Sequence, residues 1–392
     1  MQSRQRGRNN PYAMHGVSAV HTPGGRPPRR RRWRFTLRWL LLIVITLALV
    51  GLLVWGVPKL FSGGIKPVIL AEAQATDTIR AFGKNALCYN GTTLTCIEPN
   101  GRVQWFFTLG GGADFICTAT EVVAWNGAQV YVLDKSGRPI YTDRMENTVR
   151  FARAGRNYIA VCFGDAMNST LRVLTREGAL LENITTLSDL YLLDVGFFSG
   201  GQLMWVLALD VAGNAPVTQL STYEPGRMST GVAELDNEMV YHIYERGDLL
   251  MAADTSKIRA YNYRCVEQTD IAPVLIYGWT IRDVRTVTRN LHVLLEEVPQ
   301  GGGSGTLFSD LRLVTNDSVA MLRLLSPCFG SGLSDAGVYG FAENAIYYAP
   351  YGSHAFQPHY LTFGVDRLHC ILDDGVAVVS YGAQVFTLAL PK

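Results

Sequence analysis

The seven cysteines include no C-x-x-C pair, no zinc-type spacing and no short disulfide framework. The sequence therefore lacks the usual signatures of a zinc site, a thiol redox centre or a disulfide scaffold. Most cysteines, such as Cys117 and Cys370, lie in apolar runs typical of strands, where free cysteine packs as a small hydrophobic residue. Cys88 and Cys96 could face each other across a hairpin with a three-residue loop, so their pairing stays open.

Motifs of nucleotide binding and of catalysis are also absent. The glycine-rich run 301–305 is followed by no Gly-Lys-Ser or Gly-Lys-Thr, and we expect a flexible insertion there. In residues 332–337 the second glycine comes one residue too late for a nucleophile elbow. His354, His359 and His369 are close in sequence, but spacing alone does not bring metal ligands together. We predict no catalytic residue, no bound cofactor and no metal site, and hence a protein that is not an enzyme.

Charge is distributed very unevenly along the chain. Residues 1–38 contain ten arginines and no lysine, aspartate or glutamate, which leaves 25 Lys+Arg against 33 Asp+Glu in the remainder. Phosphate binding needs a concentrated basic face, so the mildly acidic remainder argues against nucleic-acid binding.

An apolar run follows the basic segment. Residues 39–57 contain no charge over 19 positions, close to the length that crosses a bilayer, and Pro58 comes directly after. The run is too long for a signal-peptide core, and the small-residue sites at 71–75 lie too far beyond it, so we expect an uncleaved anchor. The positive-inside rule places the N-terminus in the cytoplasm and the rest of the chain on the far side of the plasma membrane.

Two sets of residues flank or enter this predicted helix. The tryptophans Trp33, Trp39 and Trp55 are suited to the membrane interfaces. The arginines that set topology and attract anionic lipid are Arg29, Arg30, Arg31, Arg32, Arg34 and Arg38. The alternative for the arginine run is a cytoplasmic docking site, in which case the protein is a transmembrane sensor that reports through its tail.

The remainder of the chain repeats. Residues 86–105 align without gaps on residues 122–141, and both segments contain three strands joined by two turns, which form a pair of hairpins. Looser copies follow, with second strands expected near Leu87, Val123, Tyr158, Leu203, Leu249, Leu291, Val338 and Ala377. This spacing is typical of a propeller with four-stranded blades, eight by this count and seven as the alternative. The last unit lacks its fourth strand, and Val68–Leu70 is predicted to supply it and close the ring.

Turn residues recur at fixed places in the units. Asn-Gly pairs are typical of the first turn in each repeated segment. An acidic residue followed three positions later by glycine is typical of the second turn. The predicted turn residues are Asn90, Gly91, Gly101, Asn126, Gly127, Asp134, Gly137, Gly178 and Gly226.

With Trp105 after the turn that contains Gly101, these patterns resemble the repeats of quinoprotein-like (PQQ-like) propellers. The whole chain resembles bacterial single-pass membrane-anchored proteins with such a propeller, a domain family of unknown function. The resemblance implies the fold but no cofactor, because only Trp105 keeps the tryptophan and no adjacent cysteine pair is present.

The predicted organisation has four parts: a basic tail expected to be disordered (1–38), a transmembrane helix (39–57), a linker (58–66) and an all-β propeller (67–392). We expect the anchor to contact lipid and the propeller to bind an envelope protein or a cell-wall component as a scaffold. The alternative class is a propeller enzyme that uses a quinone or a metal in its central channel.

Overall fold

The computed structural model describes residues 39–47, 65–235, 239–298 and 307–392, and the chain divides into two units, residues 1–63 and 64–392. In the first unit a helix covers residues 39–47. No helix within the described residues is long and apolar enough to cross a membrane. The tail arginines, Trp33, Trp55 and the second half of the predicted span lie outside the described residues, while Trp39 begins the described helix and is 65% exposed.

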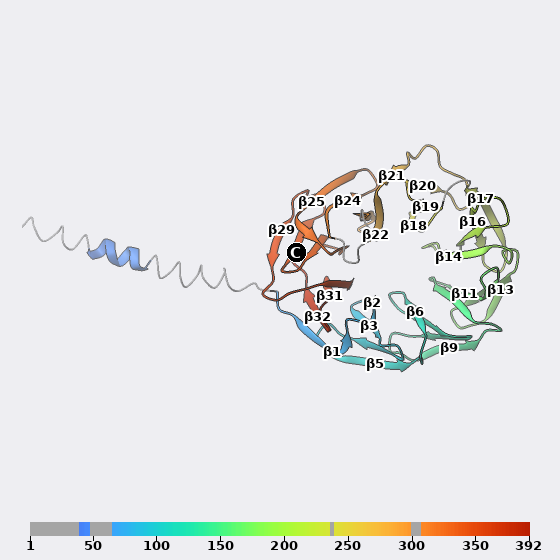
Figure 1. Cartoon of the computed structure of the whole chain (residues 1–392), viewed down its shortest axis with the longest axis horizontal. Helices are drawn as coiled ribbons and strands as arrows, with labels where there is room; N and C mark the ends of the chain where they lie inside the picture. The colour runs from blue at the N-terminus through green and yellow to red at the C-terminus, as the bar shows by residue number, and fades with distance from the viewer. Residues whose placement is uncertain (1–38, 48–64, 236–238, 299–306) are drawn as a thin grey trace, which may run out of the picture. The chain divides into compact units, whose positions relative to one another are not determined.

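Within its described residues the second unit contains strands joined by turns and loops. Its described residues form eight antiparallel four-stranded sheets, which are arranged as blades in a ring (Figure 1). The innermost strand of each blade is called A and the outermost D. The prediction of eight four-stranded blades is therefore confirmed.

The strands of blades 1 to 4 follow chain order from A to D. They are β2 (Thr78–Phe82), β3 (Asn85–Tyr89), β4 (Thr93–Ile97) and β5 (Val103–Thr108); β6 (Asp114–Cys117), β7 (Val122–Asn126), β8 (Gln129–Leu133) and β9 (Pro139–Arg144); β10 (Val149–Ala154), β11 (Tyr158–Asp165), β12 (Asn168–Thr175) and β13 (Leu180–Ile184); β14 (Tyr191–Phe197), β15 (Met204–Asp210), β16 (Val217–Glu224) and β17 (Met228–Leu235).

Blades 5 to 7 follow the same order, and blade 8 takes its outer strand from the start of the unit. They are β18 (His242–Arg246), β19 (Leu249–Ala253), β20 (Lys257–Tyr261) and β21 (Val274–Leu275); β22 (Trp279–Val287), β23 (Asn290–Glu297), β24 (Phe308–Val314) and β25 (Val319–Cys328); β26 (Gly330–Leu333), β27 (Gly337–Ala342), β28 (Ala345–Pro350) and β29 (Gln357–Tyr360); β30 (Arg367–Ile371), β31 (Val376–Tyr381), β32 (Gln384–Ala389) and β1 (Val68–Gln74).

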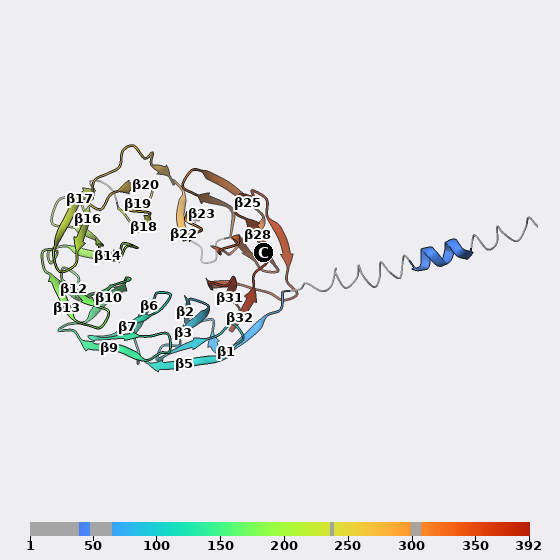
Figure 2. The ribbon, with the colours of Figure 1, turned by 180° about the vertical axis from the view of Figure 1, so that it is seen from behind.

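Closure of the ring occurs in blade 8. Strand β1 pairs antiparallel with β32, with Val68 opposite Thr387 and Ile69 opposite Phe386. Both views of the ring place β1 beside β32 (Figure 2). The predicted closure is confirmed, and it covers the edge of β32 that would otherwise be exposed.

The core lies between the blades. Each of eight buried apolar clusters combines side chains of two neighbouring blades, as where Leu87 of blade 1 packs in one cluster with Phe115 of blade 2. The second strands start within two residues of the predicted positions, because alternating apolar residues mark these buried strands.

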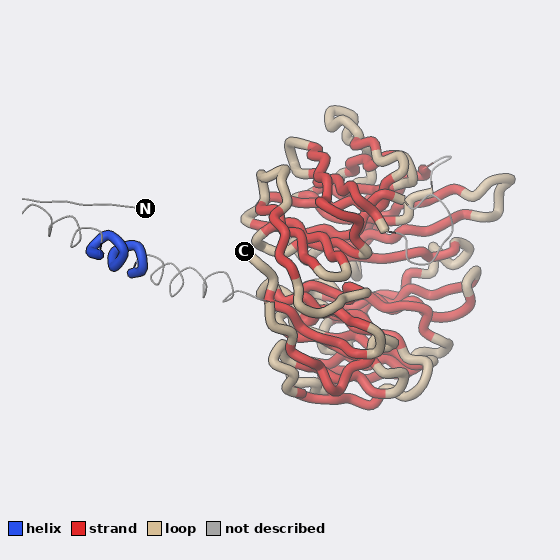
Figure 3. Tube along the Cα trace, turned by 60° about the vertical axis from the view of Figure 1, so that its left-hand side comes forward, coloured by secondary structure: helices blue, strands red, loops and turns tan. Residues whose placement is uncertain are grey.

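The strands run between two layers of loops (Figure 3). One layer holds the A–B and C–D turns, and we call it the turn face. The other holds the B–C turns and the links between blades, and we call it the acidic face for the residues described below. Because β1 is antiparallel to β32, residues 65–67 and the C-terminal residues both lie on the turn face, where Leu390 N donates to Gly375 O at 2.9 Å.

Candidate interaction site

The predicted Asn-Gly pairs lie in the B–C turns of blades 1 and 2. Gly91 has φ +93° and Gly127 has φ +56°, so both adopt the backbone region that favours glycine. The Asn90 side chain accepts hydrogen bonds from the backbone N of Thr92 at 3.1 Å and of Thr93 at 2.9 Å. These residues shape the acidic face.

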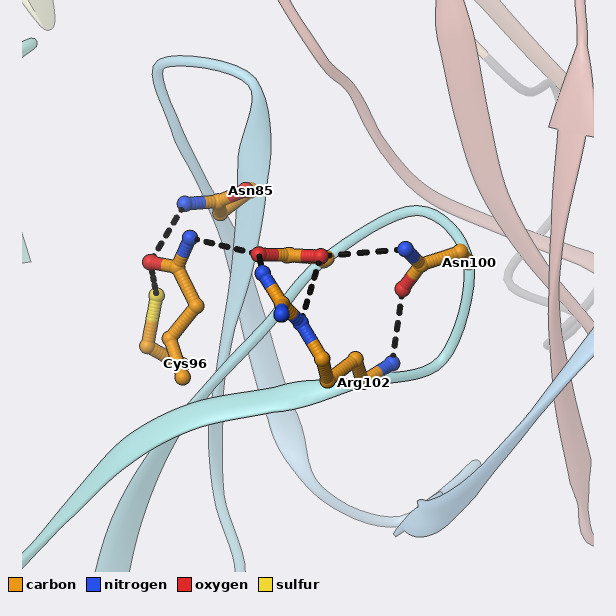
Figure 4. Close-up of polar contacts among 6 residues, drawn as sticks. Asn85, Cys96, Asn100 and Arg102 are labelled. Atoms are coloured by element: carbon orange, nitrogen blue, oxygen red, sulfur yellow. Dashed lines mark hydrogen bonds and ion pairs between the residues drawn. The ribbon is translucent and has the colours of Figure 1, made fainter.

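The C–D turn of blade 1 is held by a polar network on the turn face. The Glu98 carboxylate accepts from Arg102, from Gln104 Nε2 at 2.9 Å and from Asn100 Nδ2 at 3.0 Å (Figure 4). The hydrogen bond from Arg102, followed by that from Gln104, lowers the pKa of Glu98 to about 2. Gln104 Oε1 in turn accepts from Asn85 Nδ2 at 3.0 Å, which connects the turn to strand β3.

The predicted glycines of the C–D turns are contact points between blades. Trp105 of blade 1 lies on Gly137 of blade 2, where an added Cβ would be 2.4 Å from the ring, and Trp105 Nε1 donates to Lys135 O at 2.8 Å. Tyr141 of blade 2 lies in the same way on Gly178 of blade 3. Only glycine permits such close approach at positive φ.

Two further turns are joined to the preceding blade by hydrogen bonds. Gly226 N of blade 4 donates to Glu182 Oε2 of blade 3 at 3.2 Å. Thr387 Oγ1 of blade 8 donates at 2.5 Å to the carbonyl oxygen of Pro99, which lies two residues before Gly101 in blade 1. Asp134 accepts from the backbone N of Ser136 at 2.8 Å. The predicted turn residues thus serve the structure of the ring.

The cysteines do not form a disulfide among the described residues. All seven are free, and Cys88 lies opposite Thr95 while Cys96 lies opposite Leu87. Cys88 and Cys96 therefore point to opposite faces of the sheet, which answers the question that the sequence left open. Burial raises the pKa of both thiols to about 12, so they are protonated at neutral pH.

Arginines of the inner strands pair with carboxylates of the next blade. Arg80 of β2 lies 3.2 Å from Asp114 of β6, and Arg153 of β10 lies 2.9 Å from Asp194 of β14. Arg285 of β22 likewise contacts Asp335 at 2.8 Å. Sequence reasoning missed these pairs, because partners 34 or more residues apart meet only when the ring closes.

A small polar pocket of about 310 Å³ lies between the inner strands of blades 6, 7 and 8. It contains Arg282, Asp283 and His369, and Asp283 Oδ2 accepts from Leu333 N at 2.9 Å. Burial, followed by the charge of Arg367, lowers the pKa of His369 to about 4, so the imidazole is neutral at neutral pH. No group of three metal-binding side chains occurs among the described residues, and the neighbouring histidines are not brought together as ligands.

The acidic face differs sharply in charge from the turn face. Its described loops contain no lysine or arginine, whereas the turn face mixes both signs. Six carboxylates lie in these loops of the acidic face, namely Asp77, Glu146, Asp189, Asp254, Glu343 and Asp366. Glu146 pairs with Arg172 at 2.7 Å and Asp254 is buried. Exposed carboxylates such as Asp189 and Glu343 are therefore those that can attract a cationic partner.

A groove of about 600 Å³ opens on the acidic face of blade 7. Its lining comes from the end of β25, the B–C turn of blade 7 and the link from blade 7 to blade 8. The lining residues are Leu307, Ser326, Pro327, Phe329, Ala342, Glu343, Asn344, Ala345, Tyr347, Tyr360, Val365 and Asp366.

Hydrogen bonds fix the floor of this groove. Val365 N donates to Glu343 O and Leu361 N donates to Asn344 O, each at 2.8 Å, so the link is held on the B–C turn. Tyr347 is buried and its hydroxyl lies 2.7 Å from Ser326 Oγ, whereas Tyr360 is 74% exposed at the rim. Sequence reasoning missed the groove, because its lining comes from segments that are far apart in the sequence. No local sequence pattern indicates that these segments lie side by side in the fold.

Comparison with known proteins shows similarity in fold alone. No family model matches the chain, and no curated protein matches it. Among solved structures it is similar to Saccharomyces cerevisiae Sqt1, with 8% identity over 81% of this chain and 97% of that chain and a TM-score of 0.53. Apo AztD from Citrobacter koseri has 11% identity over 77% of this chain and 87% of that chain, with a TM-score of 0.50.

The WD40 domain of Neurospora crassa Pan2 also matches, with 10% identity over 82% of this chain and 90% of that chain and a TM-score of 0.47. At these identities the likeness concerns the fold alone. The protein is an eight-bladed β-propeller.

Proposed function

We propose that the protein is a bacterial membrane-anchored scaffold of the quinoprotein-like propeller kind, which binds an envelope protein outside the cytoplasm through the acidic face of its propeller. The observation that carries the proposal is the groove on blade 7, within a face whose described loops contain carboxylates and no basic residue. A concave apolar site with a few polar groups is the usual form of a binding site.

The anchor rests on the sequence. The uncharged run 39–57 follows ten arginines and precedes the propeller, so the positive-inside rule gives a cytoplasmic tail and an extracytoplasmic propeller in the plasma membrane. Inside the propeller unit the chain reaches β1 on the turn face. The acidic face is the opposite face of the propeller.

The topology can be tested with a protease added outside intact cells or spheroplasts. We expect the propeller to be degraded and a short basic fragment to remain with the membrane. A propeller that resists protease until the membrane is lysed would contradict this orientation, and an unlysed sample with a cytoplasmic marker protein serves as the control.

Partner binding can be tested by crosslinking in intact membranes followed by purification of the full chain. The wild type is compared with Asp189→Asn/Glu343→Gln on the acidic face and with Asp373→Asn/Asp374→Asn on the turn face. We expect an envelope protein to be captured by the wild type and the turn-face variant and reduced with the acidic-face variant. Equal capture by all three would contradict binding through the acidic face.

A further inference from the structure

We infer that the groove on blade 7 recognises a segment of a protein partner in which an apolar side chain stands next to a lysine or arginine. The inference rests on the proposed function and names the partner's chemistry at one part of the acidic face. Three features of the groove lead to it: an apolar lining, a carboxylate at its rim and a floor held in place before any ligand arrives.

The lining selects an apolar side chain. Leu307, which is 58% exposed, and the half-buried Phe329 contribute hydrocarbon surface, and the exposed ring of Tyr360 stands at the edge of the groove. A volume of about 600 Å³ holds a large side chain with its neighbouring backbone. Aromatic and aliphatic anchors seated in pockets of this kind supply most of the binding energy in protein interfaces.

The rim selects a positive charge. Glu343 is exposed at the groove, and no hydrogen bond or ion pair of its carboxylate is found within the described part of the chain. Asp366 has a different role, because its carboxylate accepts from Gly382 N at 2.6 Å and from Ser380 Oγ at 3.2 Å. Glu343 is thus the group available to a lysine or arginine, and Asp366 adds to the negative potential.

The floor is preorganised. The backbone bonds from Val365 to Glu343 and from Leu361 to Asn344 join two loops, and the contact between Tyr347 and Ser326 joins blade 7 to blade 6. A site that is already ordered loses less conformational entropy on binding, so a short segment suffices as ligand.

The test uses the full chain in nanodiscs and three fluorescent peptides in a glycine-serine background. The first carries tryptophan followed by lysine and arginine, the second tryptophan followed by two glutamates, and the third serine followed by lysine and arginine. Fluorescence anisotropy measures binding, and empty nanodiscs correct for binding to lipid. We expect the first peptide alone to bind, more weakly at high salt.

Two pairs of variants locate the site. Tyr360→Ala should weaken binding of the first peptide by about tenfold, as expected for an aromatic contact in a binding pocket, while Tyr277→Ala, a similarly exposed tyrosine outside the groove, should not change it. Glu343→Gln should weaken it by about two- to fivefold, the range for exposed charge pairs, while Asp189→Asn should not. Circular dichroism confirms that each variant folds.

Equal binding of the tryptophan-glutamate peptide would overturn the inference, as would equal weakening by Glu343→Gln and Asp189→Asn, which would indicate attraction by the face as a whole. Failure of the first peptide to bind would overturn it too. A natural partner that crosslinks to the acidic face away from blade 7 would refute this inference and leave the proposed function standing.

Discussion

The two faces of the propeller differ in how their side chains are used. On the turn face, Trp105 and Tyr141 each cover a glycine of the next blade, and Glu98 is fully engaged by its own turn. On the acidic face the exposed carboxylate of Glu343 lies at a groove and has no hydrogen bond or ion pair within the described part of the chain. The contacts that repeat along the sequence hold the ring together at one face, and the binding that we propose takes place at the other.

The strongest perturbation of the ring should be deletion of residues 65–72, which removes most of β1. It takes away the buried Leu70 and exposes the edge of β32. We expect a loss of more than about 4 kcal/mol in the free energy of unfolding, measured by urea denaturation, with aggregation at the bared edge. Deletion of 58–64 shortens the chain by a similar length before the strand and should leave stability unchanged. A stable propeller without residues 65–72 would contradict closure through β1.

A glycine pair compares the two faces directly. Gly178→Ala on the turn face places a Cβ 1.9 Å from the Tyr141 ring at φ +89°, whereas Gly91→Ala on the acidic face meets no atom within 4 Å at φ +93°. Both changes cost about 1–2 kcal/mol of left-handed strain. The clash should bring the loss for Gly178→Ala to about 3 kcal/mol or more, measured by urea denaturation. Equal losses would show that the contact between blades is unimportant.

The sequence predicted the structural features of the turn face better than the groove on the acidic face. The repeat at 86–105 and 122–141 predicted the turns, and the spacing of its looser copies and the incomplete last unit predicted the blade number and the closing strand, because hairpin chemistry is local and recurs. The groove could not be predicted, since Ser326, Glu343 and Val365 are brought together only by the packing of blades 6, 7 and 8. Charge pairs such as Arg80 with Asp114 were missed for the same reason.

The hydrogen bond of Trp105 can be separated from its packing. Trp105→Phe keeps an aromatic ring over Gly137 and removes the donor to Lys135 O. We expect a loss of about 1–2 kcal/mol, which combines the hydrogen bond with the smaller ring. Trp105→Ala, which also removes the packing, should lose about 3–5 kcal/mol. Equal losses for the two variants in urea denaturation would assign the whole effect to the hydrogen bond.

Acid should weaken the propeller through the half-buried His369. The folded-state pKa of His369 lies near 4, below its ordinary value of 6.5, so the unfolded state binds more protons between these pH values. Stability is therefore present above pH 6.5 and is lost as the pH falls toward 4. The urea midpoint should drop less between pH 7 and pH 4.5 in His369→Gln than in the wild type. Parallel pH profiles would contradict the shifted pKa.

The smallest effect is expected in the tail. Replacing Arg29, Arg30, Arg31 and Arg32 with glutamine removes attraction for anionic lipid of about 1 kcal/mol per residue at most. Arg34 and Arg38 remain beside the predicted span, so insertion should persist with a modest rise in misoriented molecules, measured by protease accessibility. Normal insertion with loss of a specific cytoplasmic partner would instead favour a sensor that reports through the tail.

The proposal that the acidic face binds the partner and the turn face does not is tested most directly with a photoreactive amino acid. It is placed in the full chain in living cells, at Tyr360 on the acidic face or at Val103 beside the turn face. Both side chains are exposed, so each probe can reach a partner. We expect a discrete crosslinked protein from position 360 and none from position 103. A crosslink from position 103 alone would contradict this expectation and would assign recognition to the opposite face.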